Sequence, residues 1–377
     1  MLLNAADKAL WRLALPMIFS NITVPLLGLV DTAVIGHLDS PVYLGGVAVG
    51  ATATSFLFML LLFLRMSTTG LTAQAWGAKD PQRLARALVQ PLALALGAGV
   101  LIILLRLPLI DLALHIVGGS EAVLEQARRF LEIRWLSAPA SLANLVLLGW
   151  LLGVQYARAP VILLVVGNLL NIVLDLWLVM GLRMNVQGAA LATVTAEYAT
   201  LIIGLLMAKR VLTLRGVSLA MLKNAWRGDL RRLLALNRDI MLRSLLLQLC
   251  FGALTVFGAR LGSDIVAVNA VLMTMLTFTA YALDGFAYAV EAHSGQAYGA
   301  RDGSQLLEVW RAACRHGGAG VCPDLQPGGA VHYRVVNLTA FPAAAGRSLS
   351  DLADDPAGGR RLVLSAGRHV YRRDARR

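Results

Sequence analysis

Ala75-Trp76-Gly77-Ala78-Lys79-Asp80 returns almost unchanged as Ala297-Tyr298-Gly299-Ala300-Arg301-Asp302, and each copy closes a long apolar segment. The first copy begins at residue 75 and the second at residue 297, an offset of 222 residues. Upstream, Gly-His-Leu-Asp-Ser at 36–40 lies opposite Ala-Arg-Leu-Gly-Ser at 259–263, a nearly equal offset. The repeated unit is therefore several membrane spans long. Repeats of this size are typical of secondary transporters, whose substrate path lies where the halves meet.

The composition places the chain in a lipid bilayer. Hydrophobic residues make up 58% of it, charged residues 15%, and the mean hydropathy is +0.67. Soluble proteins are about 45–50% apolar and about 25% charged. The net charge of +12 does not indicate nucleic-acid binding, because the basic residues lie between apolar runs. Cys250, Cys314 and Cys322 form neither a disulfide framework nor a paired metal motif.

Eight apolar runs are long enough to cross about 30 Å of hydrocarbon as helices. They are Leu13–Leu38, Leu44–Ala75, Leu88–Leu114, Trp135–Val154, Val161–Leu182, Val186–Met207, Ile240–Leu261 and Ile265–Glu291. The segment 209–238 carries eight Lys and Arg residues, whereas the loop 37–43 carries none. The positive-inside rule puts the basic segment in the cytoplasm, and an even number of spans puts the N-terminus there too.

These runs predict an all-α membrane protein in four parts: residues 1–208 form a six-helix lobe, 209–239 a basic cytoplasmic linker, 240–314 the first two helices of a second lobe, and 315–377 an aberrant tail. The tail is dense in Arg, Gly, Pro, Asp and Ala. One interpretation is a disordered basic tail. The other is translation out of frame, because a shifted frame can decode Ser365–Ala375 as Leu-Leu-Asp-Gly-Met-Tyr-Ile-Gly-Ala-Thr-Arg.

Polar groups inside the spans are the candidate site, because ionisable side chains in the bilayer are costly and usually functional. Asp31 and Asp175 each lie seven residues before the outer end of a span, which puts both carboxyl groups at the same depth. Thr193, on a span of opposite direction, reaches that level too. Asn171 and Asn168 share the helix face of Asp175. The alternative interpretation is polar bonding between helices, without a role in transport.

Two further carboxyl groups lie nearer the cytoplasmic end of the eighth span. They are Asp284 and Glu291, and their partners at the repeat offset are Leu62 and Thr69. This asymmetry predicts a cavity lining that belongs to the second half alone. Glu291 could instead extend to the membrane interface.

Several motifs in order resemble the multidrug and toxic compound extrusion (MATE) family over residues 10–314. They are Pro16 with Asp31-Thr32-Ala33-Val34-Ile35-Gly36-His37-Leu38, Thr72-Ala73-Gln74-Ala75-Trp76-Gly77-Ala78, Asn171-Ile172-Val173-Leu174-Asp175 and Gly188-Ala189-Ala190-Leu191-Ala192-Thr193. The stretch Tyr281–Asp302 is similar to the DNA-damage-inducible protein F (DinF) branch. The resemblance implies two six-helix lobes, of which about eight helices are present here. It also implies a cation site at Asp31, Asn171, Asp175 and Thr193, with Asn168, Asp284 and Glu291 as secondary candidates.

The resemblance further implies a monomeric, multi-pass transporter of the bacterial inner membrane that exports organic cations or other amphipathic compounds. Its coupling ion is expected to be the proton, with sodium at Asp31 and Asp175 as the alternative, and no cofactor or bound metal is implied. The runner-up is a flippase for a lipid-linked precursor, which a basic central cavity would favour. An inactive product of a damaged gene is a third interpretation. A membrane hydrolase is disfavoured, because the sequence lacks a Gly-x-Ser-x-Gly or His-Glu-x-x-His motif.

Overall fold

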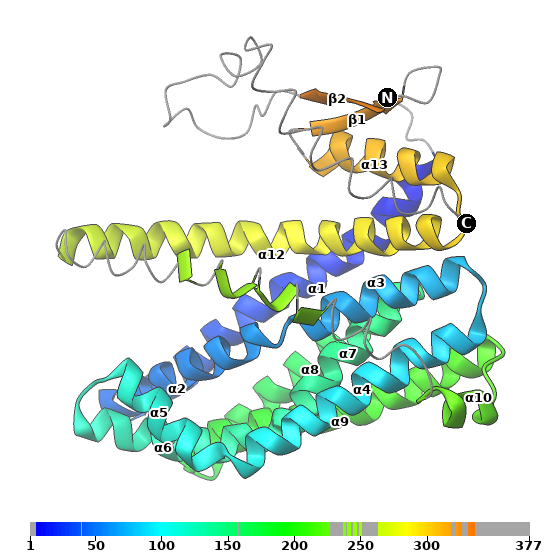
Figure 1. Ribbon diagram of the computed structural model, residues 1–377. Helices are drawn as coiled ribbons and strands as arrows, with labels where there is room; N and C mark the ends of the chain where they lie inside the picture. The colour runs from blue at the N-terminus through cyan, green and yellow to red at the C-terminus, as the bar shows by residue number, and fades with distance from the viewer. Residues whose placement is uncertain are drawn as a thin grey trace.

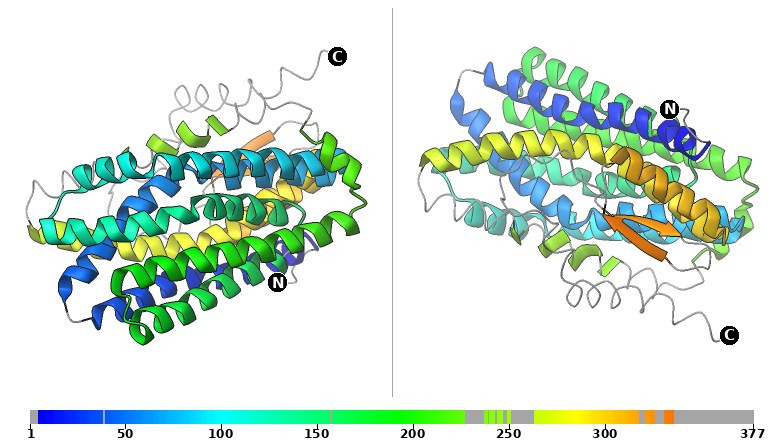
Figure 2. Two further views of the ribbon diagram at one scale, coloured as in Figure 1. Left: turned by 90° about the horizontal axis from the view of Figure 1, so that it is seen from below. Right: turned by 90° about the horizontal axis from the view of Figure 1, so that it is seen from above.

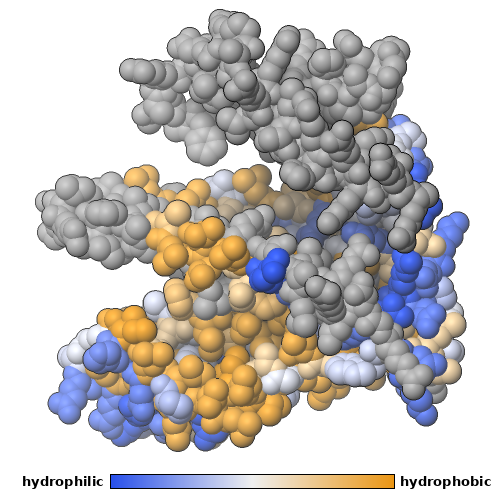
Figure 3. All heavy atoms as spheres, viewed as in Figure 1, coloured by the Kyte–Doolittle hydropathy of each residue, from blue (hydrophilic) through white to orange (hydrophobic). Residues whose placement is uncertain are grey.

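The computed structural model describes residues 5–38, 40–156, 158–226, 263–317, 321–325 and 331–335, with isolated positions between 237 and 250. Its helices lie side by side in an elongated bundle, and α12 runs along the N-terminal helices (Figures 1 and 2). In the face drawn in Figure 3, apolar residues cover the middle of the bundle and hydrophilic residues gather at its two ends. This distribution is that of a protein whose long axis crosses a bilayer.

The N-terminal lobe contains the helices up to residue 214. They are α1 (Ala5–Gly36), α2 (Pro41–Leu60), α3 (Phe63–Gly77), α4 (Pro81–Leu104), α5 (Arg106–Val117), α6 (Glu121–Arg134), the short 3-10 helix η1 (Trp135–Ser137), α7 (Ala138–Gly153), α8 (Arg158–Asp175), the π-helix η2 (Leu176–Gly181) and α9 (Asn185–Leu214). After them come α10 (Leu219–Asn224), α12 (Ser263–Gly299) and α13 (Gly303–Gly317).

Among the described residues, five helical segments are long and apolar enough to cross a membrane: Pro41–Gly77, Pro81–Leu104, Glu121–Gly153, Arg158–Gly181 and Asn185–Leu214. They correspond to the second to sixth spans expected from the sequence. The first and eighth expected spans lie in α1 and α12, and most of the seventh lies outside the described residues. The structure divides the second expected span into α2 and α3, and the third into α4 and α5.

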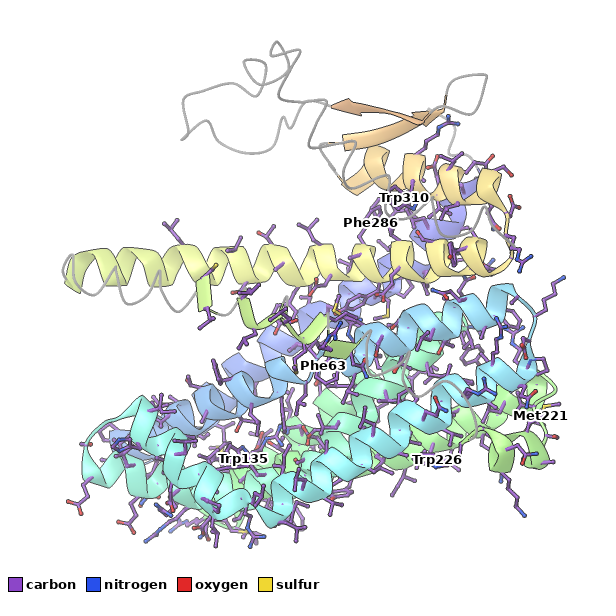
Figure 4. The ribbon with its side chains drawn as sticks, viewed as in Figure 1. Phe63, Trp135, Met221, Trp226, Phe286 and Trp310 are labelled. Atoms are coloured by element: carbon purple, nitrogen blue, oxygen red, sulfur yellow. The ribbon has the colours of Figure 1, made fainter. Side chains whose placement is uncertain are left out.

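The core of the N-terminal lobe forms around α7, which packs against α3, α4 and α9. Trp150 of α7 is fully buried, and its indole donates to the backbone oxygen of Leu84 in α4 at 3.1 Å. Trp135 is also buried, and its indole donates to Thr54 Oγ1 of α2 at 3.1 Å (Figure 4). Each buried indole therefore has the polar partner that burial requires.

The repeated six-residue motif folds in the same way in both halves. Lys79 and Arg301 have positive φ values of 53° and 57°. The amides of Ala78, Lys79 and Asp80 donate to the backbone oxygens of residues 74, 76 and 75, and the same bonds recur for Ala300, Arg301 and Asp302 with residues 296, 298 and 297. The carboxylates of Asp80 and Asp302 then accept from the first amides of α4 and α13. The duplication thus extends to the hydrogen bonds that end one helix and begin the next.

These capping bonds also affect the acid at the second turn. The hydrogen bonds from the Gln305 amide and the Ser304 hydroxyl hold the pKa of Asp302 below its usual range. The side chain lies at the solvent-exposed turn between α12 and α13, so it remains ionised at the positive start of α13.

The two halves meet where α3 contacts α12. A Cβ atom built on Gly295 would lie 2.7 Å from the Cβ of Ala73, its equivalent at the repeat offset. A Cβ on Gly77 would lie 2.0 Å from the backbone oxygen of Gln296, and one on Gly299 would lie 2.1 Å from that of Gln74. Because Gly77 and Gly299, like Gln74 and Gln296, are repeat equivalents, the contact is reciprocal. It has the self-complementary form of a two-fold interface.

The stretch after the last helix differs in part from the expected disordered tail. Residues 321–325 (β1) and 331–335 (β2) pair as an antiparallel two-stranded sheet, with Val321 opposite Val335. The alternation in Val-His-Tyr-Arg-Val suits a strand, because β-branched and aromatic residues fit a pleated surface. The other residues of 318–377 lie outside the described part of the chain.

Candidate functional site

The centre of the candidate site is a contact between α8 and α9. Asn171 is 3% exposed, and its amide Nδ2 donates to Thr193 Oγ1 at 3.0 Å. The Thr193 hydroxyl in turn donates to the backbone oxygen of Ala189 at 3.0 Å. The structure therefore joins two of the four residues that the resemblance implies for the cation site, across spans that run in opposite directions.

The side-chain oxygen of Asn171, Oδ1, is the atom of this pair that can bind a proton donor or a cation. Within the described part of the chain, Asn171 Oδ1 is buried and accepts no hydrogen bond. A buried acceptor of this kind costs free energy unless a donor or a cation reaches it. Asn171 therefore presents an oxygen that a protonated carboxyl group or a small cation can satisfy.

Asp175 lies one helical turn beyond Asn171. It is 2% exposed, and it ends α8 where the π-helix η2 begins. The wider turn is visible in the backbone bond from Leu182 N to the oxygen of Trp177 at 2.9 Å. Short π-helical stretches inside α-helices are frequent at functional sites.

Asn168 does not join this group directly. Its Nδ2 donates to Thr23 Oγ1 of α1 at 2.6 Å, and Thr23 donates to the backbone oxygen of Ser20 at 2.6 Å. Asn168 therefore connects α8 to α1, as the alternative of polar bonding between helices predicted. The backbone of Asp31 belongs to α1, but its side chain lies outside the described residues.

Glu197, in the sixth span, was missed by the sequence reasoning. Arg134 binds its carboxylate through two nitrogen–oxygen contacts of 2.9 and 3.1 Å, and the Ser141 hydroxyl donates to the same carboxylate. The side chains of Arg134 and Glu197 are only 11% and 23% exposed. The signal that could have found this pair is an acid inside a span together with arginines on its expected outer side.

Two other arginines of α6, which lie near Arg134 in the sequence, also have acidic partners. Arg128 pairs with Asp111 of α5 and Arg129 with Glu125, and all four side chains are more than 40% exposed. The helix Glu121–Arg134 is thus an amphipathic stretch whose arginines pair with acids of α5, α6 and α9.

The acids of α12 lie beside a second residue that the sequence reasoning missed. Arg65 of α3 is 4% exposed, and its guanidinium lies 4.0 Å from the ring centroid of Tyr288 of α12. Arg65 also attracts the carboxylate of Asp284. Asp284 is exposed and Glu291 partly buried. The structure therefore places charged groups of both halves along the contact between α3 and α12.

The end of the bundle that carries the repeated turns is cationic. Lys79 and Arg301 lie at these turns, and the Arg215 guanidinium stacks 3.7 Å from the ring centroid of Trp76. Gln90 of α4 donates to the backbone oxygens of Ala225 and Trp226, which holds the segment after α10 at this end (Figure 4). Across the residues that the structure describes, no cluster of three or more His, Cys, Asp and Glu side chains could hold a metal ion.

Comparison with known families gives one match that covers most of the chain. The family profile described as MatE matches residues 16–177 and 240–314. DNA damage-inducible protein F of Escherichia coli (strain K12) is 89% identical over 316 residues, which cover 84% of this chain and 69% of that protein. The probable multidrug resistance protein NorM of Thermotoga maritima is 29% identical over 196 residues, or 51% of this chain and 42% of that protein.

Solved structures agree with this match. A MOP superfamily transporter from Pyrococcus furiosus superimposes with a TM-score of 0.74 at 25% identity, over 83% of this chain and 69% of that one. A crystal structure of MATE in complex with MaD3S gives a TM-score of 0.71 at 27% identity, over 83% of this chain and 70% of that one.

Proposed function

The chain belongs to the MATE family of membrane transporters, which are not enzymes, and we propose that it is a proton-coupled antiporter. Its substrates would be organic cations or other amphipathic compounds. We further propose that it acts as a monomer in the bacterial inner membrane, with the N-terminus in the cytoplasm. The chain spans 69% of the length of its Escherichia coli relative, so the activity of the whole transporter is inferred from the part in hand.

The observation that carries the proposal is the buried pair of Asn171 and Asp175. Asn171 Oδ1 is a buried acceptor that no described group satisfies, and Asp175 lies one turn away with 2% exposure. A carboxyl group away from water is costly in its charged form. In its protonated form the carboxyl group can donate a hydrogen bond to Asn171 Oδ1. The two residues can therefore hold a proton while the site is closed to water.

The release of that proton supplies the coupling. When the site opens, water or a cationic substrate stabilises the charged carboxylate, and the proton leaves. For an uncharged substrate the exchanged proton moves one net charge, which through 100 mV is worth about 2.3 kcal/mol, enough to support a substrate gradient of roughly fiftyfold per proton. One proton exchanged for one monovalent cation moves no net charge, so that exchange is driven by the pH difference alone. Thr193 would keep the Asn171 amide oriented so that its oxygen faces the exchange path. Sodium at the same carboxylates is the alternative coupling ion.

The test is the exchange of Asp175 or Asp31 for asparagine. Asp175→Asn and Asp31→Asn should each abolish the proton-driven efflux of a cationic dye from an efflux-deficient bacterium. The matched control is Asp111→Asn, an exposed acid paired with Arg128 at the end of the bundle, which should keep normal efflux. Proton-driven efflux retained by both site variants would overturn the assignment.

The second candidate is the flippase for a lipid-linked precursor, and buried Arg65 is the observation that favours it. Among the described residues, none forms a hydrogen bond with Arg65 Nε or Nη1. A guanidinium group with spare donors binds phosphate well. Arg65→Gln would abolish translocation of a phosphate-bearing lipid in the flippase, but would leave dye efflux driven by Asp175 intact in the antiporter.

We also propose that residues 315–377 are translated out of frame. The support is the change of composition at this point and the largely apolar sequence that the shifted frame restores. The 377-residue product would then be inactive, whereas the frame-restored form would transport. For this reason the efflux test is done in both forms.

A further inference from the structure

A cavity lies away from the Asn171 and Asp175 pair, at the cationic end of the bundle. It has a volume of about 790 Å³ and lies between the start of α1, the turn from α7 to α8, and the end of α12. Its lining residues are Ala9, Arg12, Leu13, Pro16, Gln155, Tyr156, Arg158, Val161, Ile162 and His293. The cavity therefore contacts both halves of the protein.

The floor of this cavity is held rigidly. Gln155 adopts a positive φ of 57°, and its Nε2 donates to Gln296 Oε1 of α12 at 2.7 Å. The same Nε2 lies 3.2 Å from His293 Nδ1. It also lies 3.4 Å from the backbone oxygen of Ala292. These contacts join the turn between α7 and α8 to α12 before any ligand enters.

The mouth of the cavity is positive. Arg12 and Arg158 line it from α1 and α8, and both are exposed. Within the described part of the chain neither guanidinium forms an ion pair, and none of the described lining residues is acidic. Two guanidinium groups with spare planar donors favour a phosphate.

An apolar track leads away from this positive mouth toward the centre of the bilayer. Ile162 lines the cavity, and Val165, Val166 and Leu169 follow it on the same face of α8. All four are exposed, by 40, 40, 37 and 59%. From Arg158 to Leu169 the helix rises about 16 Å, which matches half of a hydrocarbon core of about 30 Å.

We propose that this cavity binds one anionic phospholipid of the cytoplasmic leaflet. Its phosphate lies between Arg12 and Arg158, and its acyl chain follows α8 past Ile162 and Leu169. Two arginines that form no ion pair with any described residue, together with an apolar track of half-bilayer length, select a lipid rather than a soluble anion. This site does not depend on the proposed antiport, because it is read out by lipid binding alone.

The experiment measures lipid binding by the purified 377-residue chain in detergent. Phosphatidylglycerol is titrated, and bound lipid is counted by native mass spectrometry while the melting temperature is followed. Arg12→Gln and Arg158→Gln should each weaken binding about fivefold, and the double variant about 25-fold, since each basic side chain near an anionic lipid surface contributes about that factor. The matched control, Arg128→Gln with Arg129→Gln on α6, removes the same charge at the opposite end and should bind as the parent does.

Three further measurements test whether the ligand is an anionic lipid or free phosphate, and whether the apolar track on α8 contributes to its binding. At equal concentration, phosphatidylethanolamine and inorganic phosphate should each raise the melting temperature by at most a tenth of the increase that phosphatidylglycerol gives. Ile162→Ser should weaken phosphatidylglycerol binding while the melting temperature without lipid stays unchanged. Equal binding by the double arginine variant, equal stabilisation by inorganic phosphate, or equal binding of phosphatidylethanolamine would each overturn the proposal.

Discussion

The contact between the repeated halves can be tested by adding one methyl group at Gly77. A Cβ at this position would lie 2.0 Å from the backbone oxygen of Gln296 and 2.9 Å from the amide of Ala300. Ordinary carbon–oxygen contacts begin near 3.3 Å. In Gly77→Ala, α3 and α12 must therefore move apart by about 1 Å, because backbone atoms have no rotamer with which to escape.

Two opposing terms set the size of the effect. Replacing a helical glycine by alanine stabilises a helix by up to about 1 kcal/mol. Forcing apart a packed contact costs about 1–3 kcal/mol, and a backbone clash lies at the upper end of that range. The clash wins, so Gly77→Ala should lose about 2 kcal/mol of stability. The same loss is expected for Gly299→Ala, whose Cβ would lie 2.1 Å from the oxygen of Gln74.

The assay is thermal unfolding of the purified chain in detergent, followed by helical circular dichroism. The matched control is Gly70→Ala on the same helix, where a Cβ meets nothing within 4 Å. This control should melt at the parent temperature or slightly above it. The double variant Gly77→Ala with Gly299→Ala should lose less than the sum of the single losses, because one separation of α3 from α12 relieves both clashes.

The reasoning would be refuted if Gly77→Ala melted together with Gly70→Ala. That result would mean that the two copies of the motif do not touch in the folded protein. Full additivity of the two alanine variants would also count against it, since independent sites share no common movement.

The remaining predictions concern ion pairs, topology and the tail. Arg134→Ala should lower the stability by about 3 kcal/mol, because it leaves the mostly buried Glu197 carboxylate uncompensated. Arg128→Ala breaks an exposed pair and should lower the stability by less than about 1 kcal/mol. Equal melting temperatures of the two variants would contradict this ranking. In a cysteine-free background, a cysteine at Lys223 should resist a membrane-impermeant thiol reagent in intact cells while one at His37 reacts, and the reverse pattern would invert the topology. Sequencing the DNA around codon 315 should find a shift of one base relative to the frame that encodes the apolar continuation, and an uninterrupted frame would make the tail a genuine terminus.

Much of the architecture follows from the sequence for a simple reason. A helix rises 1.5 Å per residue, so the position of a residue along its span gives its depth without knowledge of its neighbours. This rule placed Thr193 at the level of Asp175, and the structure bonds Thr193 at 3.0 Å to Asn171, which lies one turn before Asp175 on the same span. The repeated motif is equally local, because its turn is closed by bonds between residues at most five positions apart.

Only the tertiary structure decided which helix each polar side chain faces. In lipid an apolar helix has no wet side, so hydrophobic periodicity gives little information about its rotation. Asn168 could face Asp175 or α1 by sequence alone, and the packing of α1 against α8 directs it to Thr23. For the same reason the pairing of Arg134 with Glu197 and the burial of Arg65 against Tyr288 were not visible in the sequence. The depth of a residue in the membrane follows from its position along one helix, whereas the neighbour that its side chain faces depends on how separate helices pack.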